Sequence, residues 1–315
     1  MILCCGEALI DMIPAKTEDA GTGFVPHSGG SVFNTAIALG RLGTRAGMLT
    51  GLSRDLFGRQ LDDALKASHV DTRTVVYSDR PATLAFVQLE AGHATYTFYD
   101  ENSANRMLAP EDVGALPEDV LALYFGGISL CNPPAADTYL ELAERHAGRC
   151  AIMLDPNIRP SFISDIPAYR ARIARMLAVA DIVKVSDEDL GWLYPGPEAL
   201  MEKLAALLKA GPSVAIMTRG GSGATAYLRD GREISVAAEP AQVVDTVGAG
   251  DTFNAGVLAK ASELGLLTPG GLAEAGEAEI SDVLAFGAKV AAVTVSRAGA
   301  NPPWREELAQ ERPPA

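Results

Sequence analysis

The apolar positions of the chain follow two alternating patterns. Short apolar runs, typical of strands that are covered on both faces, alternate with longer stretches in which apolar residues recur at helical spacing. This alternation predicts an α/β fold, a doubly wound and mostly parallel sheet with helices on both faces. The expected core strands lie at residues 2–5, 46–50, 121–127, 151–155, 181–185 and 214–218, and the expected helices at 31–43, 56–68, 167–180 and 201–211.

Two segments need separate interpretation. The apolar run MILCCGEALIDMIP, residues 1–14, is predicted to be a buried first strand. Residues 83–102 form two stretches with period-2 alternation joined at EAGH, which predicts an antiparallel hairpin. In an α/β chain such a hairpin is an insertion. It is either a small lid over a site or an ordinary sheet edge, and the segment alone favours neither strongly.

Composition narrows the class of protein. With 315 residues, 48% of them hydrophobic and 6% aromatic, the chain can bury a large globular core. The net charge of -14 argues against nucleic-acid and anionic-membrane partners, so an anionic ligand must be held locally. Four cysteines (4, 5, 131 and 150) form no C-x-x-C pair, which predicts reduced, buried thiols and a cytoplasmic protein.

Common nucleotide and hydrolase motifs are missing from the sequence. It contains no Walker A pattern, no G-x-G-x-x-G after the first strand, no H-E-x-x-H and no G-x-S-x-G. What remains is a set of polar and glycine clusters that follow the predicted strands. Open α/β sheets bind their ligands at that edge.

The strongest cluster is VVDTVGAGDTFNAGVLA, residues 243–259. Gly248, Ala249 and Gly250 precede a helical run, so their backbone N–H groups and the positive end of the helix dipole predict an anion site. Asp251 lies inside this site, although a carboxylate repels a bound anion. Its position there requires a chemical reason.

A second cluster could bind hydroxyl groups. Asp11, Gly29, Gly30 and Asn34 would meet at one sheet edge, where a carboxylate and a carboxamide can hydrogen-bond a polyol. The alternative is a solvated turn residue and a tight turn before a helix.

Three further candidates follow other strands. Arg159 in DPNIRP offers a planar fork for an anion, or a surface ion pair with Asp155 or Asp165. Ser186 is a good N-cap, which is enough to explain it. In the last candidate, TRGGSGATAYL, the turn is either a flexible hairpin or a backbone cradle for phosphates. The residues of that turn are Thr218, Gly220 and Gly223.

These residues carry a family resemblance. DTVGAGDTFNAGVL, residues 245–258, resembles the C-terminal signature of the PfkB/ribokinase family of carbohydrate kinases. SGGSVFNTAIALGRLG resembles the N-terminal signature, with Val32 where many members have a smaller residue. Within the family, CCGEALIDMIP, FYDENSA, FGGISL, DPNIRP and KVSDEDL are most similar to bacterial fructokinases. The resemblance implies one ribokinase-like domain over residues 1–315, with β-lid segments around 12–28 and 74–102.

The resemblance also implies a reaction, the transfer of the ATP γ-phosphate to a sugar hydroxyl. Asp251 would be the base, and the N–H groups of the loop before it would stabilise the phosphoryl oxygens together with Arg159. The sugar would be held by Asp11, Gly29, Gly30, Asn34 and Phe98, and the nucleotide by Ser186, Thr218, Gly220 and Gly223.

Two ions are implied by the same resemblance. Magnesium would bridge the β- and γ-phosphates of ATP, mostly through water. Where many members have Asn-x-x-Glu this chain has residues 186–189, so Asp189 is the candidate acid behind the magnesium. A potassium ion would lie beside the anion site, bound by Asp245 and the carbonyl of Val247.

Substrate choice depends on one position. Kinases of acidic sugars in this family tend to have an arginine where this chain has Asp100, so we expect a neutral ketohexose, fructose, to give fructose 6-phosphate. Arg106 lies nearby and weakens this argument, and 2-keto-3-deoxygluconate, ribose and a nucleoside are weaker alternatives. A non-catalytic sugar or nucleotide sensor is a candidate from another class, and a dehydrogenase lacks any fingerprint. Exposed lid strands predict a homodimer.

Overall fold

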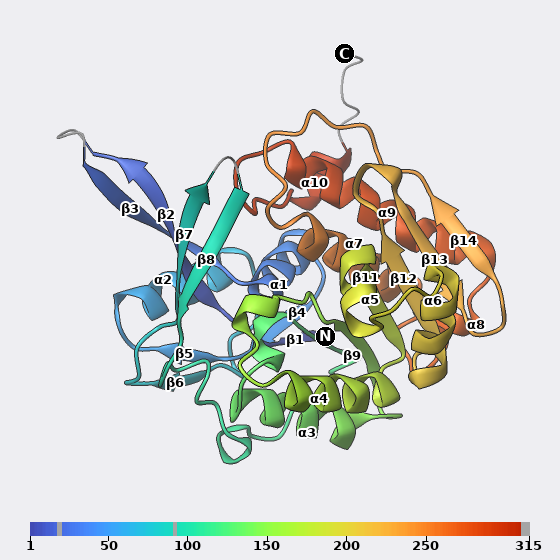
Figure 1. The fold of residues 1–315 in the computed structure, drawn as a ribbon, viewed down its shortest axis with the longest axis horizontal. Helices are drawn as coiled ribbons and strands as arrows, with labels where there is room; N and C mark the ends of the chain where they lie inside the picture. The colour runs from blue at the N-terminus through green and yellow to red at the C-terminus, as the bar shows by residue number, and fades with distance from the viewer. Residues whose placement is uncertain (18–20, 91–92, 310–315) are drawn as a thin grey trace.

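The large sheet of the molecule contains all six expected core strands. The computed structural model describes residues 1–17, 21–90 and 93–309 (Figure 1). The sheet has the order β14-β13-β12-β11-β10-β9-β1-β4, and the six strands from β12 to β4 are parallel. Strands β13 and β14 add an antiparallel edge. The bounds are β1 Ile2–Cys5, β4 Ala46–Leu49, β9 Ala122–Gly126, β10 Ala151–Asp155, β11 Ile182–Ser186, β12 Val214–Thr218, β13 Ala224–Leu228 and β14 Glu233–Val236.

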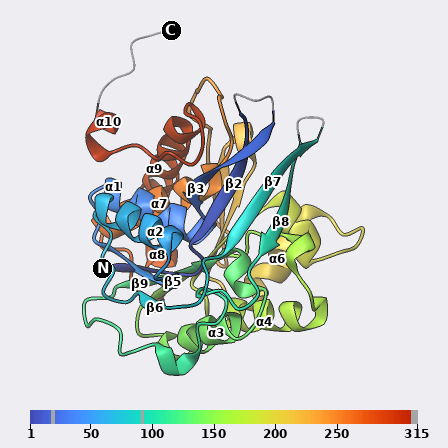
Figure 2. The same cartoon turned by 90° about the vertical axis from the view of Figure 1, so that its left-hand side faces the viewer.

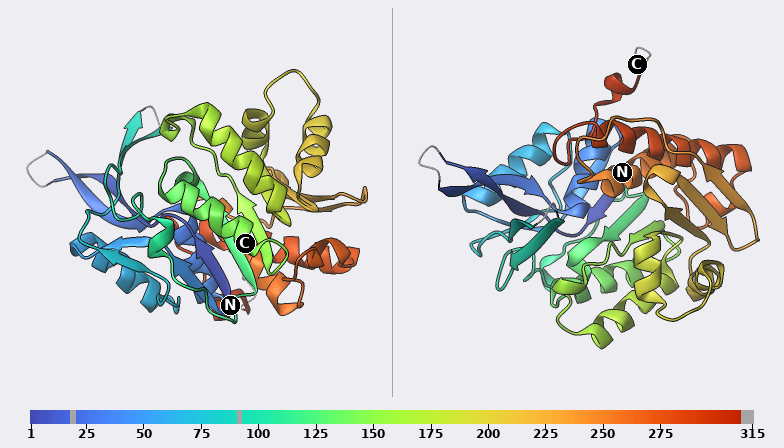
Figure 3. Two further views of the ribbon diagram at one scale, coloured as in Figure 1. Left: turned by 90° about the horizontal axis from the view of Figure 1, so that it is seen from below. Right: turned by 45° about the horizontal axis from the view of Figure 1, so that its top comes forward.

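Helices cover both faces of this sheet. Side chains of a strand alternate between its faces, so Ile2 and Cys4 of β1 join one core cluster while Leu3 and Cys5 join the other. Both faces are therefore apolar, and the strands read as continuous apolar runs. The first cluster includes residues of α1 (Ser31–Arg41), α2 (Leu56–Ala67), α7 (Ala249–Glu263), α8 (Gly271–Glu274), α9 (Glu277–Val295) and α10 (Arg305–Ala309). The second includes residues of α3 (Ala135–His146), α4 (Ile166–Val179), α5 (Asp187–Leu193) and α6 (Leu200–Ala210). Figure 3 shows the helices on the sheet from below and with the top turned toward the viewer.

The first apolar run is two strands in two different sheets, so the prediction of one strand over residues 1–14 was wrong. β1 belongs to the large sheet, whereas β2 (Leu9–Lys16) belongs to a small one. The chain changes sheets over residues 6–8, where Gly6 is tightly enclosed. A Cβ at Gly6 would lie 2.5 Å from Cγ2 of Val32. Local periodicity could not separate the strands because residues on both sides of the link are buried.

The small sheet has the order β3-β2-β7-β8 and projects from one side of the large sheet (Figure 2). Its strands are β2, β3 (Thr22–Gly29), β7 (Leu84–Glu90) and β8 (His93–Tyr99), hereafter the lid sheet. The antiparallel pairing of β7 with β8 confirms the hairpin predicted at residues 83–102. Residues 91–92 of its EAGH turn lie outside the described residues.

Short elements complete the fold. A two-stranded sheet joins β5 (Gly51–Ser53) and β6 (Val76–Ser78), and the 3-10 turns are η1 (Pro110–Asp112), η2 (Gly127–Leu130), η3 (Pro160–Phe162) and η4 (Gly220–Ser222). All four cysteines are buried and unpaired, as the sequence predicted. Within the described ranges, no helix is both long and apolar enough to span a membrane.

Candidate active site

A cavity of about 240 Å³ lies between the lid sheet and the large sheet. Segments from both ends of the chain meet in its wall, because parallel strands bring their carboxyl ends to one edge. Predicted site residues that line it are Asp11, Gly30, Asn34, Phe98, Arg159, Val247, Gly248, Ala249, Gly250 and Asp251. The two clusters that the sequence predicted as an anion site and a hydroxyl site are therefore parts of one cavity.

The predicted anion site is the start of α7. Gly248 has φ 76° and ψ 2°, the left-handed conformation that favours glycine, and it precedes the first helical residue, Ala249. No side chain caps this helix. The N–H of Ala249 donates to the carbonyl of Thr246 at 3.3 Å, whereas no acceptor is found among the described residues for the N–H of Gly250, which is left for a ligand. The positive end of the helix dipole favours an anion at the same place.

Asp251 lies in the first turn of α7 and is buried. Its Oδ2 accepts a hydrogen bond of 2.9 Å from Nδ2 of Asn34. Burial raises the pKa of Asp251 to about 7; the bond from Asn34 and the charge of Lys184 oppose this, while Asp155 and Glu7 add to it. A carboxyl group with this pKa can accept a proton from a hydroxyl near neutral pH.

The side of the cavity that the sequence predicted to bind hydroxyl groups is built by the lid sheet and α1. Asp11 of β2 lines the wall, and burial raises its pKa to about 6. Phe98 of β8 packs edge-on against Phe162 at 4.7 Å between ring centroids. Gly29 does not line the cavity, but a Cβ there would lie 2.1 Å from Oδ2 of Asp11. It therefore makes room for Asp11 and is not itself a wall residue.

Sequence reasoning missed Glu7, which joins the two sides of this cavity. Its Oε1 accepts hydrogen bonds from the Ser31 backbone N–H at 2.9 Å and the Ser31 hydroxyl at 2.7 Å. Its Oε2 accepts one from the backbone N–H of Ser129 at 3.2 Å. The carboxylate thus caps α1, which has no cap of its own at Gly30. The sequence did contain one sign of this role, because Glu7 is an acidic residue inside the apolar run of residues 1–14.

Arg159 lines the cavity with a guanidinium that is free of carboxylates among the described residues. It donates to the carbonyl of Ile158 at 3.1 Å, and it forms no ion pair with Asp155 or Asp165. Asp165 instead caps α4 through the N–H of Ala168. The alternative of a surface ion pair is therefore excluded, and the side chain can meet an anion.

Lys184 is a second cation in the cavity wall that sequence reasoning missed. It lies in the central strand β11 with a side chain that is only 6% exposed, and its Nζ is 3.1 Å from Oδ2 of Asp155. A lone cation within the apolar strand at residues 181–185 was the signal that could have found it.

A second cavity of about 490 Å³ adjoins the first. It contains Thr218, Gly220 and Gly223 of the glycine-rich turn between β12 and β13. Ala249 and Gly250 line both cavities, so a ligand in each would meet at the start of α7. The turn and the predicted anion site are therefore connected through the walls of the two cavities.

Ser186 and Asp189 line neither cavity. They form a capping box at the start of α5: the hydroxyl of Ser186 accepts from the N–H of Asp189 at 3.0 Å and donates to its Oδ2 at 2.7 Å. Oδ1 of Asp189 accepts from the N–H of Ile158 at 2.8 Å. Both carboxylate oxygens thus accept hydrogen bonds from the protein.

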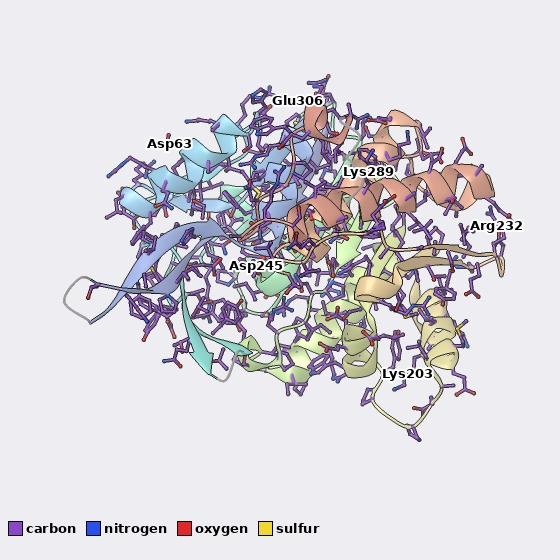
Figure 4. All side chains as sticks on the ribbon, turned by 90° about the horizontal axis from the view of Figure 1, so that it is seen from above. Asp63, Lys203, Arg232, Asp245, Lys289 and Glu306 are labelled. Atoms are coloured by element: carbon purple, nitrogen blue, oxygen red, sulfur yellow. The ribbon has the colours of Figure 1, made fainter. Side chains whose placement is uncertain are left out.

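Asp245 lies at the turn before the anion site. Its carboxylate accepts hydrogen bonds from the N–H of Val247 at 3.0 Å and of Gly299 at 2.8 Å. In Figure 4 it lies between the lid strands and helix α9. This pairing fixes the turn that carries the Val247 carbonyl. The predicted potassium ligands are therefore neighbours.

The structure changes the argument from Asp100. This residue is buried and forms an ion pair with Arg106, whose Nη1 lies 3.1 Å from Oδ1 and 3.2 Å from Oδ2. Neither residue lines the first cavity. Because Arg106 neutralises the carboxylate, Asp100 cannot be the group that repels an acidic sugar. The acids in the cavity wall are Glu7, Asp11 and Asp251.

Two adjoining cavities meet at the N-terminus of a helix with a buried carboxylate beside it, an arrangement suited to an enzyme that moves an anionic group between two ligands. The chain belongs to the pfkB family of carbohydrate kinases, whose model matches residues 1–307. It is 51% identical over 269 residues to a fructokinase of Rhizobium leguminosarum bv. trifolii, covering 85% of this chain and 82% of that protein. The enzyme is thus an ATP-dependent sugar kinase.

Solved structures agree with this assignment. A fructokinase of Xylella fastidiosa with bound ATP matches 98% of this chain and 96% of that one, with a TM-score of 0.88 and 27% identity. A fructokinase double mutant of Vibrio cholerae O395, in a form with bound fructose, ADP and potassium ion, matches 95% and 93%, with a TM-score of 0.81 and 25% identity. These neighbours confirm the ribokinase-like α/β fold predicted from the sequence.

Proposed function

We propose that this enzyme transfers the γ-phosphoryl group of ATP to a hydroxyl of fructose and forms fructose 6-phosphate. The observation that carries the proposal is the loop of Gly248 to Gly250, which borders both cavities directly beside Asp251. The 51% identity to a named fructokinase supports the choice of sugar.

In the proposed reaction the sugar lies in the first cavity and ATP in the second. Asp251 takes the proton of the attacking hydroxyl, which explains why an acid lies beside an anion site. The N–H groups at the start of α7 and the guanidinium of Arg159 stabilise the phosphoryl oxygens. Asp11, Gly30 and Asn34 orient the sugar under Phe98. Thr218, Gly220 and Gly223 hold the nucleotide.

Two ions belong to the proposal. Magnesium, when bound, neutralises charge on the β- and γ-phosphates. No group of three or more His, Cys, Asp or Glu side chains could hold a metal among the residues described, which fits an ion carried by the ATP phosphates and water. Asp189 would act on it through water, while Ser186 orients Asp189. Asp245 and the Val247 carbonyl would bind potassium. A homodimer stays a prediction.

The first test is a coupled assay of ADP release with Mg-ATP and a panel of fructose, 2-keto-3-deoxygluconate, ribose, glucose and adenosine. We expect fructose to be preferred, and potassium added to a buffer free of sodium and potassium to increase turnover. A preference for the acidic sugar would keep the kinase and reject fructose. No turnover with any substrate would favour a sugar or nucleotide sensor, because a sensor needs the cavities but not the base.

The pH dependence tests Asp251 as the base. The proton acceptor must be ionised, and its pKa is raised to about 7, so kcat/KM for the sugar should fall as pH drops below 7. Asp11, with a pKa raised to about 6, should steepen the fall below pH 6. Initial rates between pH 5 and 9 at constant ionic strength measure this. An acid limb centred near pH 4, the usual range of an aspartate, would contradict it.

A further inference from the structure

Lys184 places a buried positive charge next to the anion site. It projects from β11, in the middle of the large sheet, and its side chain is 6% exposed. A Cβ added at Gly250 would lie 3.3 Å from its Nζ, so the ammonium lies against the backbone of the loop that starts α7. Burying a charge is costly unless it is paired, so a lysine here needs a reason.

The protein pairs this ammonium only in part. An ammonium has three N–H donors, and over residues 1–17, 21–90 and 93–309 the acceptor found for Nζ is Oδ2 of Asp155, at 3.1 Å. Oδ2 of Asp155 also accepts a hydrogen bond of 2.7 Å from Nδ2 of Asn254, and its Oδ1 accepts one of 3.1 Å from the N–H of Asn157. Asp155 is therefore fixed by three partners, whereas Lys184 keeps donor capacity toward the cavity that it lines.

The ammonium stays charged despite its burial. Burial acts to lower the pKa of Lys184, but the nearby carboxylates of Asp155, Asp189 and Asp251 outweigh this and raise it above its usual value. Three acids around one lysine leave the region net negative before a phosphate arrives. A positive charge facing the cavity would reduce the repulsion between Asp251 and a phosphoryl group.

We propose that Lys184 is a catalytic residue that donates a hydrogen bond to an oxygen of the transferring phosphoryl group. This inference rests on the proposed kinase reaction and adds a group to it. In that step the bond from Pγ to the oxygen shared with ADP breaks and a bond from Pγ to the sugar oxygen forms. The hydroxyl proton goes to Asp251. Lys184 keeps its proton and stabilises negative charge on Pγ from the side of β11, while Arg159 acts from its loop.

A simpler role must be separated from this one, namely that Lys184 only neutralises the buried Asp155. Lys184→Met leaves the buried carboxylate of Asp155 without its charged partner, so both roles predict a loss of stability. The double variant Lys184→Met/Asp155→Asn removes both charges and should regain most of the lost melting temperature. Asp155→Asn alone keeps the lysine and is the matched control.

If Lys184 acts on the phosphoryl group, the double variant stays catalytically impaired. We expect its kcat to be lower than that of Asp155→Asn by about 10²-fold, the usual effect of losing one such donor. KM for fructose should change little, because the ammonium does not hold the sugar. Recovery of kcat together with the melting temperature would overturn the proposal and leave Lys184 as a neutralising residue.

Nucleotide affinity gives a readout that needs no turnover. Isothermal titration calorimetry with ATP and with ADP, in the presence of magnesium and without sugar, compares ligands that differ by the γ-phosphate. The double variant should bind ATP several-fold more weakly relative to Asp155→Asn, and ADP equally well. Equal changes for ATP and ADP would contradict a contact with the γ-phosphate. If the unmodified enzyme phosphorylates no sugar but this contrast holds, the proposed function fails and the role of Lys184 stands.

Discussion

Asp251→Asn is expected to lower kcat by roughly 10³–10⁴-fold, close to the upper range for loss of a general base. An amide has almost the same shape as the carboxyl group, and its oxygen can still accept the 2.9 Å hydrogen bond from Asn34. The cavity should therefore keep its geometry while the proton acceptor is lost. The coupled ADP-release assay measures the rate, and calorimetry should show that fructose still binds.

Asp181→Asn is the matched control for this change. Asp181 directly precedes β11, at the end of that strand opposite to Ser186, and accepts hydrogen bonds from the N–H groups of Ile152 at 2.8 Å and Gly270 at 2.9 Å. It thus has a structural role away from the cavity, and its loss should reduce stability but not kcat. Turnover by Asp251→Asn within tenfold of the unmodified enzyme would show that another group accepts the proton.

Asp251→Asn should also be more stable than the unmodified enzyme at alkaline pH. Asp251 has a pKa of about 7 when folded and the ordinary value of 3.8 when unfolded, so the unfolded state releases its proton first as pH rises. Stability from this group is full below pH 3.8 and is lost as pH rises through 7. Asparagine carries no such penalty. The difference in melting temperature should therefore grow from pH 5 to pH 8, and a lower melting temperature of the variant at pH 8 would contradict it.

Gly248→Ala is expected to lower kcat by about 10²-fold, because small displacements at a reacting centre have effects of that size. Gly248 has φ 76°, a conformation that costs an alanine about 1–2 kcal/mol. The added Cβ would also lie 2.6 Å from Cβ of Ala300, so the loop must move. That movement displaces the N–H groups that would hold the phosphoryl oxygens.

Gly265→Ala separates backbone strain from this displacement. Gly265 has φ 73°, but a Cβ there meets nothing within 4 Å. It also lies just beyond α7, at the helix end opposite to the anion site. Both variants should lose melting temperature, but only Gly248→Ala should lose turnover. If Gly248→Ala keeps kcat within threefold of Gly265→Ala, the loop is not the anion site that we propose.

Residue patterns alone were enough to predict the layered fold and to find the loop that we propose as the anion site. Strands covered on both faces are apolar at most positions, so the runs at 151–155 and 214–218 could be recognised in the sequence. A glycine-rich loop before a helix is likewise a local feature, so Gly248 and Asp251 were found together. The four named helices were recovered to within one or two residues because helical periodicity reports burial directly.

The pairing of charged groups became visible only in the folded arrangement of the strands. Asp251 and Asn34 are bonded across 217 positions of the chain, and Glu7 reaches Ser129 across 122. The same is true of Lys184, which meets Asp155 on the neighbouring strand. Asp100 and Arg106 are only six residues apart, but the sequence alone did not show that they form an ion pair. Periodicity records whether one residue is buried, whereas such pairings depend on the order of strands in the sheet. The family resemblance of the sequence therefore predicted the reaction, whereas the structure identified the charged groups around the proposed site.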